Sequence, residues 1–332
     1  MAVTFADYIR FMQTASVFNP IARFDFLNPD ETVYQSFSAE VTGGSLTANR
    51  ANGVRRTCNI NVNNIYNTFT PNPLTFWVNQ KFQLSLGYNI NGEDYFIPQG
   101  IFGLKTAETL HVKSQKEATI NGIDKFGFLD GQMGGRLISI YSLPIATNIV
   151  AAIKDILVES AVNDPKAPLL IIDAAETTPY TIYKEYGSSY GELVLELNNI
   201  LASNMFYGIS GRLICEPDVL NSIKDSKWDF NTDSQVYLGI VQAHKIDEAY
   251  NVVLVVGDNV EGNIAIGVAR NDDPSSPLST LRIGEKVAPP ITDTVIDTDE
   301  RAQARAEYEL KRYASLAIGA TITCIPLFHL DC

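Results

Sequence analysis

A run of ten residues, Lys81–Ile90, alternates between apolar and polar side chains and is followed at once by Asn91-Gly92. Alternation with a period of two is typical of a half-buried strand, and Asn-Gly favours the two-residue turn of a β-hairpin. Shorter segments of strand-like sequence lie on both sides of this run, at Ile21–Phe26, Thr32–Phe37, Ser38–Leu46, Thr57–Ile65, Tyr95–Ile97, Gly100–Lys105 and Ala118–Ile123. Many short strands with regular turn signals predict a barrel or a sandwich, and we favour a small antiparallel β-barrel over residues 18–131. Residues 1–17 are expected to form a short amphipathic helix and a connector.

The pattern changes in residues 132–233, where helical spacing appears between short strands. Pro144 suits a first helical turn, and apolar residues then recur at helical spacing, at Ile145, Ile149, Ile153 and Ile156. Strands are expected at 169–173, 181–186 and 206–215. A second helix is expected from Ser189, with Glu192 three residues later as in a capping box. These residues predict an α+β domain inserted between two β regions.

Strand patterns return in residues 234–332, at 236–241, 250–257 and 264–270. A helix is expected from about Asp297, with Gly319 as its stop, followed by a last strand over 320–327. We therefore predict a mostly β, α+β fold in which two small antiparallel β-barrels flank the inserted domain. The second barrel would lack an edge, and an open edge must be covered. Either the chain continues or another chain covers that edge.

The charge of the chain argues against nucleic acid as a specific partner. It has 38 acidic and 25 basic side chains, a net charge of −13, and its clearest basic group is only Arg50 with Arg55-Arg56. Binding to a duplex needs clustered lysine and arginine. If the protein lined a channel for DNA, its acidic side chains would repel the phosphates and let the DNA slide past. No apolar run of about 18 residues is present to span a membrane, and residues 1–8 do not resemble a secretory signal.

One motif invites a catalytic interpretation. Gly187-Ser188-Ser189-Tyr190-Gly191 is a G-x-S-x-G sequence between an expected strand and an expected helix, as in a hydrolase nucleophile elbow. Asp229 or Asp247, with His244 or His329, could complete a triad. The preceding strand carries Lys184 and Glu185, however, whereas a strand of a parallel sheet should be continuously apolar. Capping the helix is a sufficient role for Ser189, and we expect no catalytic site.

No cofactor or metal site is expected either. Residues 229–233 resemble the start of an EF-hand loop, but Ser234 and Ile240 stand where glycine and a bidentate glutamate are needed. The glycine-rich run 131–136 lacks the Lys-Ser/Thr pair of a phosphate loop. The histidines are far apart, at His111, His244 and His329. Acidic pairs fall in a loop and at a helix start, at Asp272-Asp273 and Asp299-Glu300.

The four cysteines show no metal-binding or disulfide spacing. Cys58, Cys215 and Cys324 lie in or beside apolar strand patterns and are expected to be buried free thiols, and the fourth is Cys332. This usage is consistent with synthesis in a reducing cytoplasm. A surface carbohydrate-binding β protein remains an alternative, but it should show an export signal and clustered aromatic residues, whereas Trp77 and Trp228 stand apart.

With these elements placed, the chain resembles the phage baseplate-hub or tail-associated protein family, which also occurs in phage-like particles of Gram-positive bacteria. The resemblance is carried by residues 121–130, which close the first β region, by the α+β segment after them, and by residues 249–257, which open the second. The loop Asn271–Pro277 and the late helix complete the order of elements. The order of elements carries this resemblance, since no single motif is specific.

The resemblance implies a structural role in a phage or prophage tail. Three copies would form a ring in which six barrels face the hexameric tail tube and threefold symmetry faces a spike or fibre. The implied partners are the tube or distal tail protein, the tape-measure protein and the spike or fibre, within a virion assembled in the host cytoplasm. Members of the family often carry a lytic or receptor-binding segment after the hub; the sequence ends too early, at Cys332, to show one, which leaves an enzymatic role of the full protein open.

Overall fold

The computed structural model divides the chain into two compact units, Met1–Val219 with Pro326–Cys332, and Leu220–Ile325. We call them the first and second unit and describe each by itself. The structure describes residues 3–70, 79–112, 115–159, 169–170, 175–201, 203–217, 225–231, 234–244, 249–258, 264–293, 296, 298–316 and 318–332.

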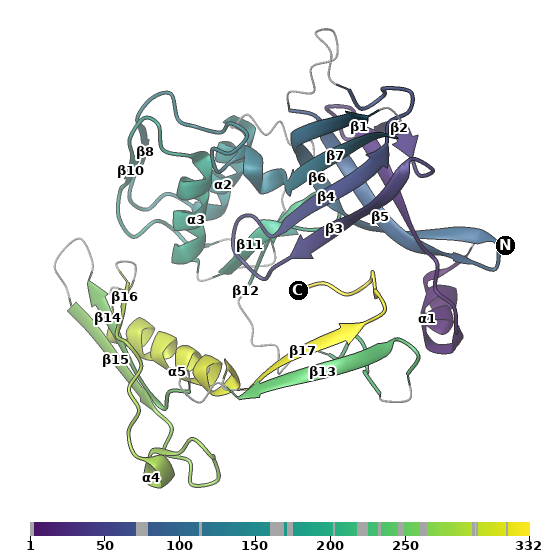
Figure 1. Cartoon of the computed structure of the whole chain (residues 1–332). Coiled ribbons are helices and arrows are strands. Elements are labelled where there is room, and N and C mark those ends of the chain that lie inside the picture. Colours follow the sequence, from purple (N-terminus) through teal and green to yellow (C-terminus); the bar gives the residue numbers. More distant parts are fainter. Residues whose placement is uncertain are drawn as a thin grey trace. The chain divides into compact units, whose positions relative to one another are not determined.

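The first unit contains helix α1 (Phe5–Thr14) and a seven-stranded antiparallel sheet in the order β2-β1-β5-β6-β7-β4-β3 (Figure 1). The strands are β1 (Pro20–Leu27), β2 (Val33–Phe37), β3 (Val41–Ala48), β4 (Arg56–Asn63), β5 (Lys81–Ile90), β6 (Glu93–Val112) and β7 (Gln115–Asp124). The hairpin predicted at Asn91-Gly92 is confirmed: it joins β5 to β6, and both residues have positive φ, 54° and 89°. Such angles are those of the turn that matches strand twist.

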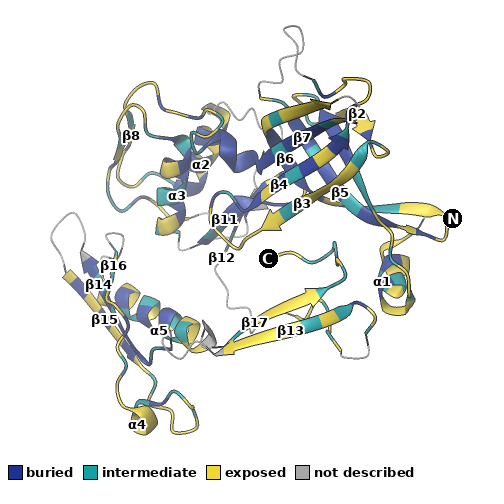
Figure 2. Cartoon of the chain, viewed as in Figure 1, coloured by how far each residue is buried: buried dark blue, intermediate teal, exposed yellow. Residues whose placement is uncertain are grey.

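Aromatic side chains fill the core of this sheet. Phe24, Phe82 and Phe102 are fully buried, and the rings of Phe24 and Phe82 lie 4.7 Å apart. They come from β1, β5 and β6, which are neighbours in the sheet, and these strands bury more than one face because each has consecutive buried residues. The expected alternation is clearest in β4, where buried and less buried positions alternate (Figure 2), whereas β1, β5 and β6 contain consecutive buried residues.

The expected first barrel is not closed. Strand β2 pairs with β1 only over Phe24–Leu27, and β3 pairs only with β4 among the described strands. Residues Pro20–Arg23 of β1 pair with β5 on one side and have no described strand on the other. The hydrogen-bonded ladder therefore stops at β2 and β3, because β2 is too short to follow the whole of β1. The result is a curved open sheet.

A short 3-10 helix, η1 (Lys125–Phe128), leads from β7 into the α+β part of the first unit. Its elements are β8 (Tyr141–Leu143), α2 (Ile149–Glu159), β9 (Leu169–Leu170), β10 (Ile182–Lys184), α3 (Tyr190–Ile200), β11 (Ser203–Tyr207) and β12 (Leu213–Pro217). Helix α2 starts later than expected, because Asn148 caps it by accepting a hydrogen bond from Ala151 N at 2.9 Å. Ile145 therefore lies in the preceding turn and is exposed.

The second unit contains a two-stranded ribbon, β13 (Tyr237–His244) with β17 (Ile318–Cys324), and a three-stranded sheet in the order β15-β14-β16. Its other elements are β14 (Val252–Asp258), β15 (Ile264–Arg270), α4 (Thr280–Ile283), β16 (Ile291–Asp293) and α5 (Asp299–Leu316). Ala302 and Ala306 of α5 pack with Val253 and Val255 of β14 in the core of this sheet.

The second region differs from the expected barrel in two ways. Its five described strands form two separate sheets, and neither sheet closes on itself. The last strand also ends at Cys324 and not at 327, and Pro326–Cys332 return to the first unit. The start of α5 at Asp299 agrees with the expected start to within two residues, but Asp297 lies outside the described residues.

Candidate functional site

Ser189 has the capping role and no described catalytic partner. It is the N-cap of α3, its side chain is buried, and its Oγ accepts a hydrogen bond from Glu192 N at 3.1 Å. Of the residues that could complete a triad, His329 is hydrogen-bonded through Nδ1 to Tyr8 Oη at 3.3 Å, and Asp229 accepts from Ser226. Asp247 and the side chain of His244 lie outside the described residues.

The G-x-S-x-G sequence belongs to an internal structural repeat. The order strand, turn, cap and helix occurs twice, and each residue of the first copy corresponds to one 41 residues later, as Ile149 does to Tyr190. Both helices have 11 residues, and the strands β8 and β10 pair antiparallel. Gly187 and Ala146 occupy the same turn position with positive φ, 85° and 62°.

The two copies of the repeat form equivalent backbone hydrogen bonds to each other. Leu137 N donates to Ser188 O, as Thr178 N does to Thr147 O. This reciprocity is that of a local twofold axis between β8 and β10. The glycine in the motif therefore serves a left-handed turn, which glycine adopts without strain. The repeat explains the motif without a nucleophile.

Replacing Ser189 by alanine is expected to lower the free energy of unfolding of the first unit by about 1 kcal/mol, the usual cost of losing an N-cap. Asn148→Ala removes the equivalent cap of α2 and is the matched control, with a loss of similar size. Hydrogen exchange of the two helices measures both. A hydrolytic activity lost in Ser189→Ala and kept in Asn148→Ala would contradict the capping role.

The other expected absences can be examined only where the structure is described. Within those ranges, no three histidine, cysteine, aspartate or glutamate side chains gather as a metal site. Residues 232–233 of the EF-hand-like segment and Trp77 lie outside them. The glycine-rich run 131–136 packs against the second copy of the repeat: Gly135 O accepts from Tyr190 N, and Arg136 donates to Gly187 O at 2.9 Å.

The cysteines are free, and two of them match the expectation fully. Cys58 and Cys215 are buried, Cys324 is half-buried, and Cys332 is exposed. Burial raises the pKa of Cys58 to about 12 and also raises the pKa of Cys215. Because the thiolate is the reactive form, these two thiols are poor nucleophiles at neutral pH.

Asp124 is the last residue of β7 and the N-cap of η1. Its carboxylate accepts hydrogen bonds from the backbone N of Arg55, Arg56 and Phe126 at 2.7, 2.9 and 3.1 Å. Burial nevertheless raises the pKa of Asp124 to about 6, because desolvation of the charge outweighs these bonds and the nearby Arg56 guanidinium.

The pH dependence of stability should reveal Asp124. Because its pKa in the folded state lies above the ordinary 3.8, its contribution to stability is full below 3.8 and is lost as the pH rises through about 6. We expect the unfolding free energy of the first unit to gain on the order of 1–3 kcal/mol from this group between pH 7 and pH 4. Urea unfolding at several pH values measures the slope. Asp124→Asn should reduce that slope, and an unchanged slope would contradict the assignment.

A buried ionic cluster joins the sheet to the α+β part of the first unit. The side chains of Glu31 and Lys125 are both fully buried, and Lys125 Nζ lies 2.6 Å from Glu31 Oε1. Lys81 Nζ lies 3.4 Å from the same oxygen. Lys125 also donates to Gly211 O in the β11–β12 loop at 2.9 Å and lies 5.1 Å from the ring centre of Tyr207. One ammonium group thus holds three parts of the unit together.

Residues Pro326–Cys332, which we call the strap, bind along the same sheet. Tyr88 donates to Pro326 O at 2.8 Å, and Gln99 donates to Phe328 O at 3.0 Å. Arg56 pairs with Asp331 at 2.5 Å. Through His329 the strap also contacts Tyr8 of α1, whose pKa burial raises to about 12. These bonds come from β4, β5 and β6, so the strap is part of the first unit.

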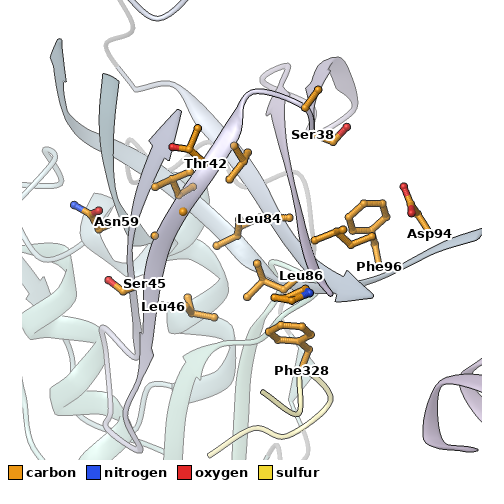
Figure 3. A pocket seen from close by; sticks show the side chains of 18 residues that line it. Ser38, Thr42, Ser45, Leu46, Asn59, Leu84, Leu86, Asp94, Phe96 and Phe328 are labelled. Atoms are coloured by element: carbon orange, nitrogen blue, oxygen red, sulfur yellow. The ribbon is translucent and has the colours of Figure 1, made fainter. Parts of the chain in front are cut away.

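The unpaired edges of β1 and β3 border a cavity of about 550 Å³, which we call the seam (Figure 3). Its lining is mostly apolar, and Leu46, Leu84 and Leu86 lie between the strands in Figure 3. Phe328 of the strap contributes to the lining at one end. The seam lies where the ladder between β1 and β3 is missing. Apolar lining and unpaired backbone together suit an extended polypeptide better than a polar ligand.

Comparison with known proteins identifies the fold. No family model matches the chain, and a search of curated proteins finds no match. Among solved structures, the tail protein from Neisseria meningitidis MC58 is similar, with a TM-score of 0.58 and 12% identity, over 92% of this chain and 80% of that protein. The 43 kDa tail protein of prophage MuSo2 from Shewanella oneidensis gives 0.57 and 12%, over 92% and 82%. The chain shares its fold with these two tail proteins.

A membrane-spanning role finds no support in the helices. None of the helices in the described ranges has both the length and the apolar character needed to cross a bilayer.

Proposed function

We propose that this chain is a structural component of a phage or prophage tail. It would be a hub of the tail tip or baseplate that joins the hexameric tail tube to the distal spike or fibre as a homotrimer. The observation that carries the proposal is the fold, which matches two tail proteins, one of them from a prophage, over 92% of this chain and at least 80% of each of theirs. A match over nearly the whole length favours a common architecture over one shared domain.

The chemistry of the described residues is consistent with a structural role. Ser189 serves as a helix cap, the two buried thiols have raised pKa values, and the conspicuous clusters hold parts of the fold together. We therefore propose that the chain itself has no enzymatic activity and that it acts through protein contacts in the tail. Its proposed partners are the tube or distal tail protein, the tape-measure protein and the spike or fibre.

Unlike closed barrels, the two β regions would bring unpaired strand edges to the ring. Both contain unpaired strand edges, and such edges are protected in stable proteins by a covering chain or by charges. We propose that the barrel-like arrangement is completed only in the assembled ring. Interfaces that join one patch to a different patch generate rings when the rotation closes.

Native mass spectrometry of the purified chain tests the trimer. The expected main species has three times the mass of the 36.6 kDa chain, and it should persist on dilution to low micromolar concentration. Immunogold labelling of tails from a producing strain should mark the distal tip. A protein that remains monomeric when concentrated, or label on the capsid, would overturn the proposal.

A further inference from the structure

The outer edge of β15 is closed by side chains of α5 and not by a strand. Strand β15 pairs with β14 on one side, and no other described strand pairs with it. Asp299 Oδ1 accepts a hydrogen bond from Ile266 N at 2.9 Å, and Gln303 Oε1 accepts one from Val268 N at 3.1 Å. Two backbone donors that an edge strand usually presents to water or to another chain therefore have partners in the helix.

The spacing of the helix matches the spacing of the strand. Residues four apart in a helix are separated by about 6 Å along its axis, and residues two apart in a strand by about 6.7 Å. Asp299 and Gln303 are four apart on α5, and Ile266 and Val268 are two apart on β15. The two acceptors thus face the two donors, much as alternate carbonyl groups of a neighbouring strand would.

The helix approaches the strand closely at Gly267, which lies between the two donors. A Cβ at Gly267 would collide with the backbone of Ala302 and Gln303, and Ala302 is fully buried against the sheet (Figure 1). Glu307 orients the amide of Gln303, because its Oε1 accepts from Gln303 Nε2 at 3.0 Å and leaves the amide oxygen to Val268. A chain of hydrogen bonds from Glu307 to the strand therefore holds the contact in one geometry.

The sequence of β15 would favour pairing if its edge were open. Residues 264–269, Ile-Ala-Ile-Gly-Val-Ala, contain no charged residue and no proline. Segments of this kind form stacked strands between chains when an edge is accessible. Ile264, Ile266 and Val268 are exposed on the face of β15 away from α5, and Arg270 at the end of the strand is its only charged residue. The strand itself carries little protection against pairing.

We propose that α5 is a guard that takes the place of a neighbouring strand and keeps the edge of β15 closed to strand addition. The helix supplies the acceptors that a pairing strand would supply, and its backbone at Ala302 fills the space beside Gly267. Withdrawal of the two side chains would leave two accessible N–H groups on an uncharged, apolar strand. This role of α5 belongs to the second unit by itself and is independent of the proposed tail function.

Hydrogen exchange of single amides tests the guard directly. In the wild type the N–H groups of Ile266 and Val268 should be protected, although they lie on the outer edge. We call Asp299→Ala with Gln303→Ala the open-edge variant, and in it these two amides should exchange at least about fivefold faster, since each loses its acceptor. The N–H of Gly267 should change much less, because successive N–H groups of a strand point to opposite sides and this one faces β14. Unprotected amides at Ile266 and Val268 in the wild type would overturn the proposal.

Strand addition is measured as the growth of β-rich aggregates. At equal concentration the open-edge variant should form aggregates that bind thioflavin T about tenfold faster than the wild type, because its uncharged edge is accessible. Circular dichroism before incubation establishes that the variant is folded. Adding Ile266→Lys places a charge on the strand, and it should suppress the aggregates without restoring protection at Val268.

Two controls separate the acceptors from the helix that carries them. Glu300→Ala removes a neighbouring acidic residue of the same turn, which none of the described hydrogen bonds joins to β15, and should behave as the wild type. Gln303→Glu with Glu307→Gln keeps an acceptor for Val268 N and a donor beside it, at unchanged composition, and should also behave as the wild type. If the open-edge variant unfolds, Gln303→Ala alone gives the same test at Val268.

Two further results would overturn the guard. An open-edge variant that stays folded, with unchanged exchange at Ile266 and Val268 and no faster aggregation, would show that these side chains do not close the edge. Aggregation that persists after Ile266→Lys is added, or that Glu300→Ala provokes equally, would place its origin away from the edge of β15.

Discussion

Replacing Lys125 by methionine is expected to lower the free energy of unfolding of the first unit by about 3–5 kcal/mol. The variant keeps the volume of the side chain but removes the nearest described cation from Glu31, whose side chain is fully buried; the next described cation is Lys81 Nζ at 3.4 Å. A buried carboxylate that loses its nearest cation must remain charged at a high cost or take up a proton. Native-state hydrogen exchange of β5 and β6 measures the loss.

Two further variants identify the cause of that loss. Glu31→Gln combined with Lys125→Met removes both charges of the closest pair and should recover part of the stability, because no buried carboxylate is left without its nearest cation. Lys116→Met at an exposed position is the control and should change stability by no more than about 0.5 kcal/mol. A loss below about 1 kcal/mol in Lys125→Met would mean that water reaches Glu31.

Gly267→Val is expected to destabilise the second unit by about 3 kcal/mol or more, at the upper end of the cost of overpacking. A Cβ at Gly267 would collide with the backbone of Ala302 and Gln303, and backbone cannot move aside as a flexible side chain can. Helix α5 would have to leave β15, which would also break the hydrogen bond from Val268 N to Gln303 Oε1 at 3.1 Å. Hydrogen exchange of β14 measures the effect.

The control for this variant lies one residue away. Ile266→Val changes a side chain that is 54% exposed on the opposite face of β15, and the expected change is within about 0.5 kcal/mol. Exchange in the first unit should be unchanged in Gly267→Val. Equal losses in both units would contradict the division of the chain into two compact units.

Local chemistry made part of the fold predictable. The Asn91-Gly92 hairpin and the cap at Ser189 each depend on a few consecutive residues, and both are found. Pro144 and Ile145 fit a helical pattern and favour an earlier start of α2, whereas Asn148 supplies the cap, and the helix begins at Ile149. When two possible helix starts lie a few residues apart, the helical spacing of apolar residues does not decide between them.

The larger features depend on residues that are distant in sequence. Glu31 and Lys125 are 94 positions apart, and Tyr8 and His329 are 321 apart, so no local pattern announces either contact. The open seam follows from β2 being shorter than β1, and strand alternation alone does not give the pairing range. The internal repeat could have been found by comparing the turns at Ala146 and Gly187 with the helix caps that follow them.

The return of the chain to the first unit has a consequence for how the second unit can be detached. Residues 220–325 leave and rejoin the same body, and the rejoining end is fastened by Tyr88, Gln99 and Arg56. A single proteolytic cut inside that stretch therefore frees neither piece, because each remains covalently continuous with a segment of the first unit. Release of the second unit requires two cleavages, so the protein stays in one piece after a single cleavage as long as both units remain folded.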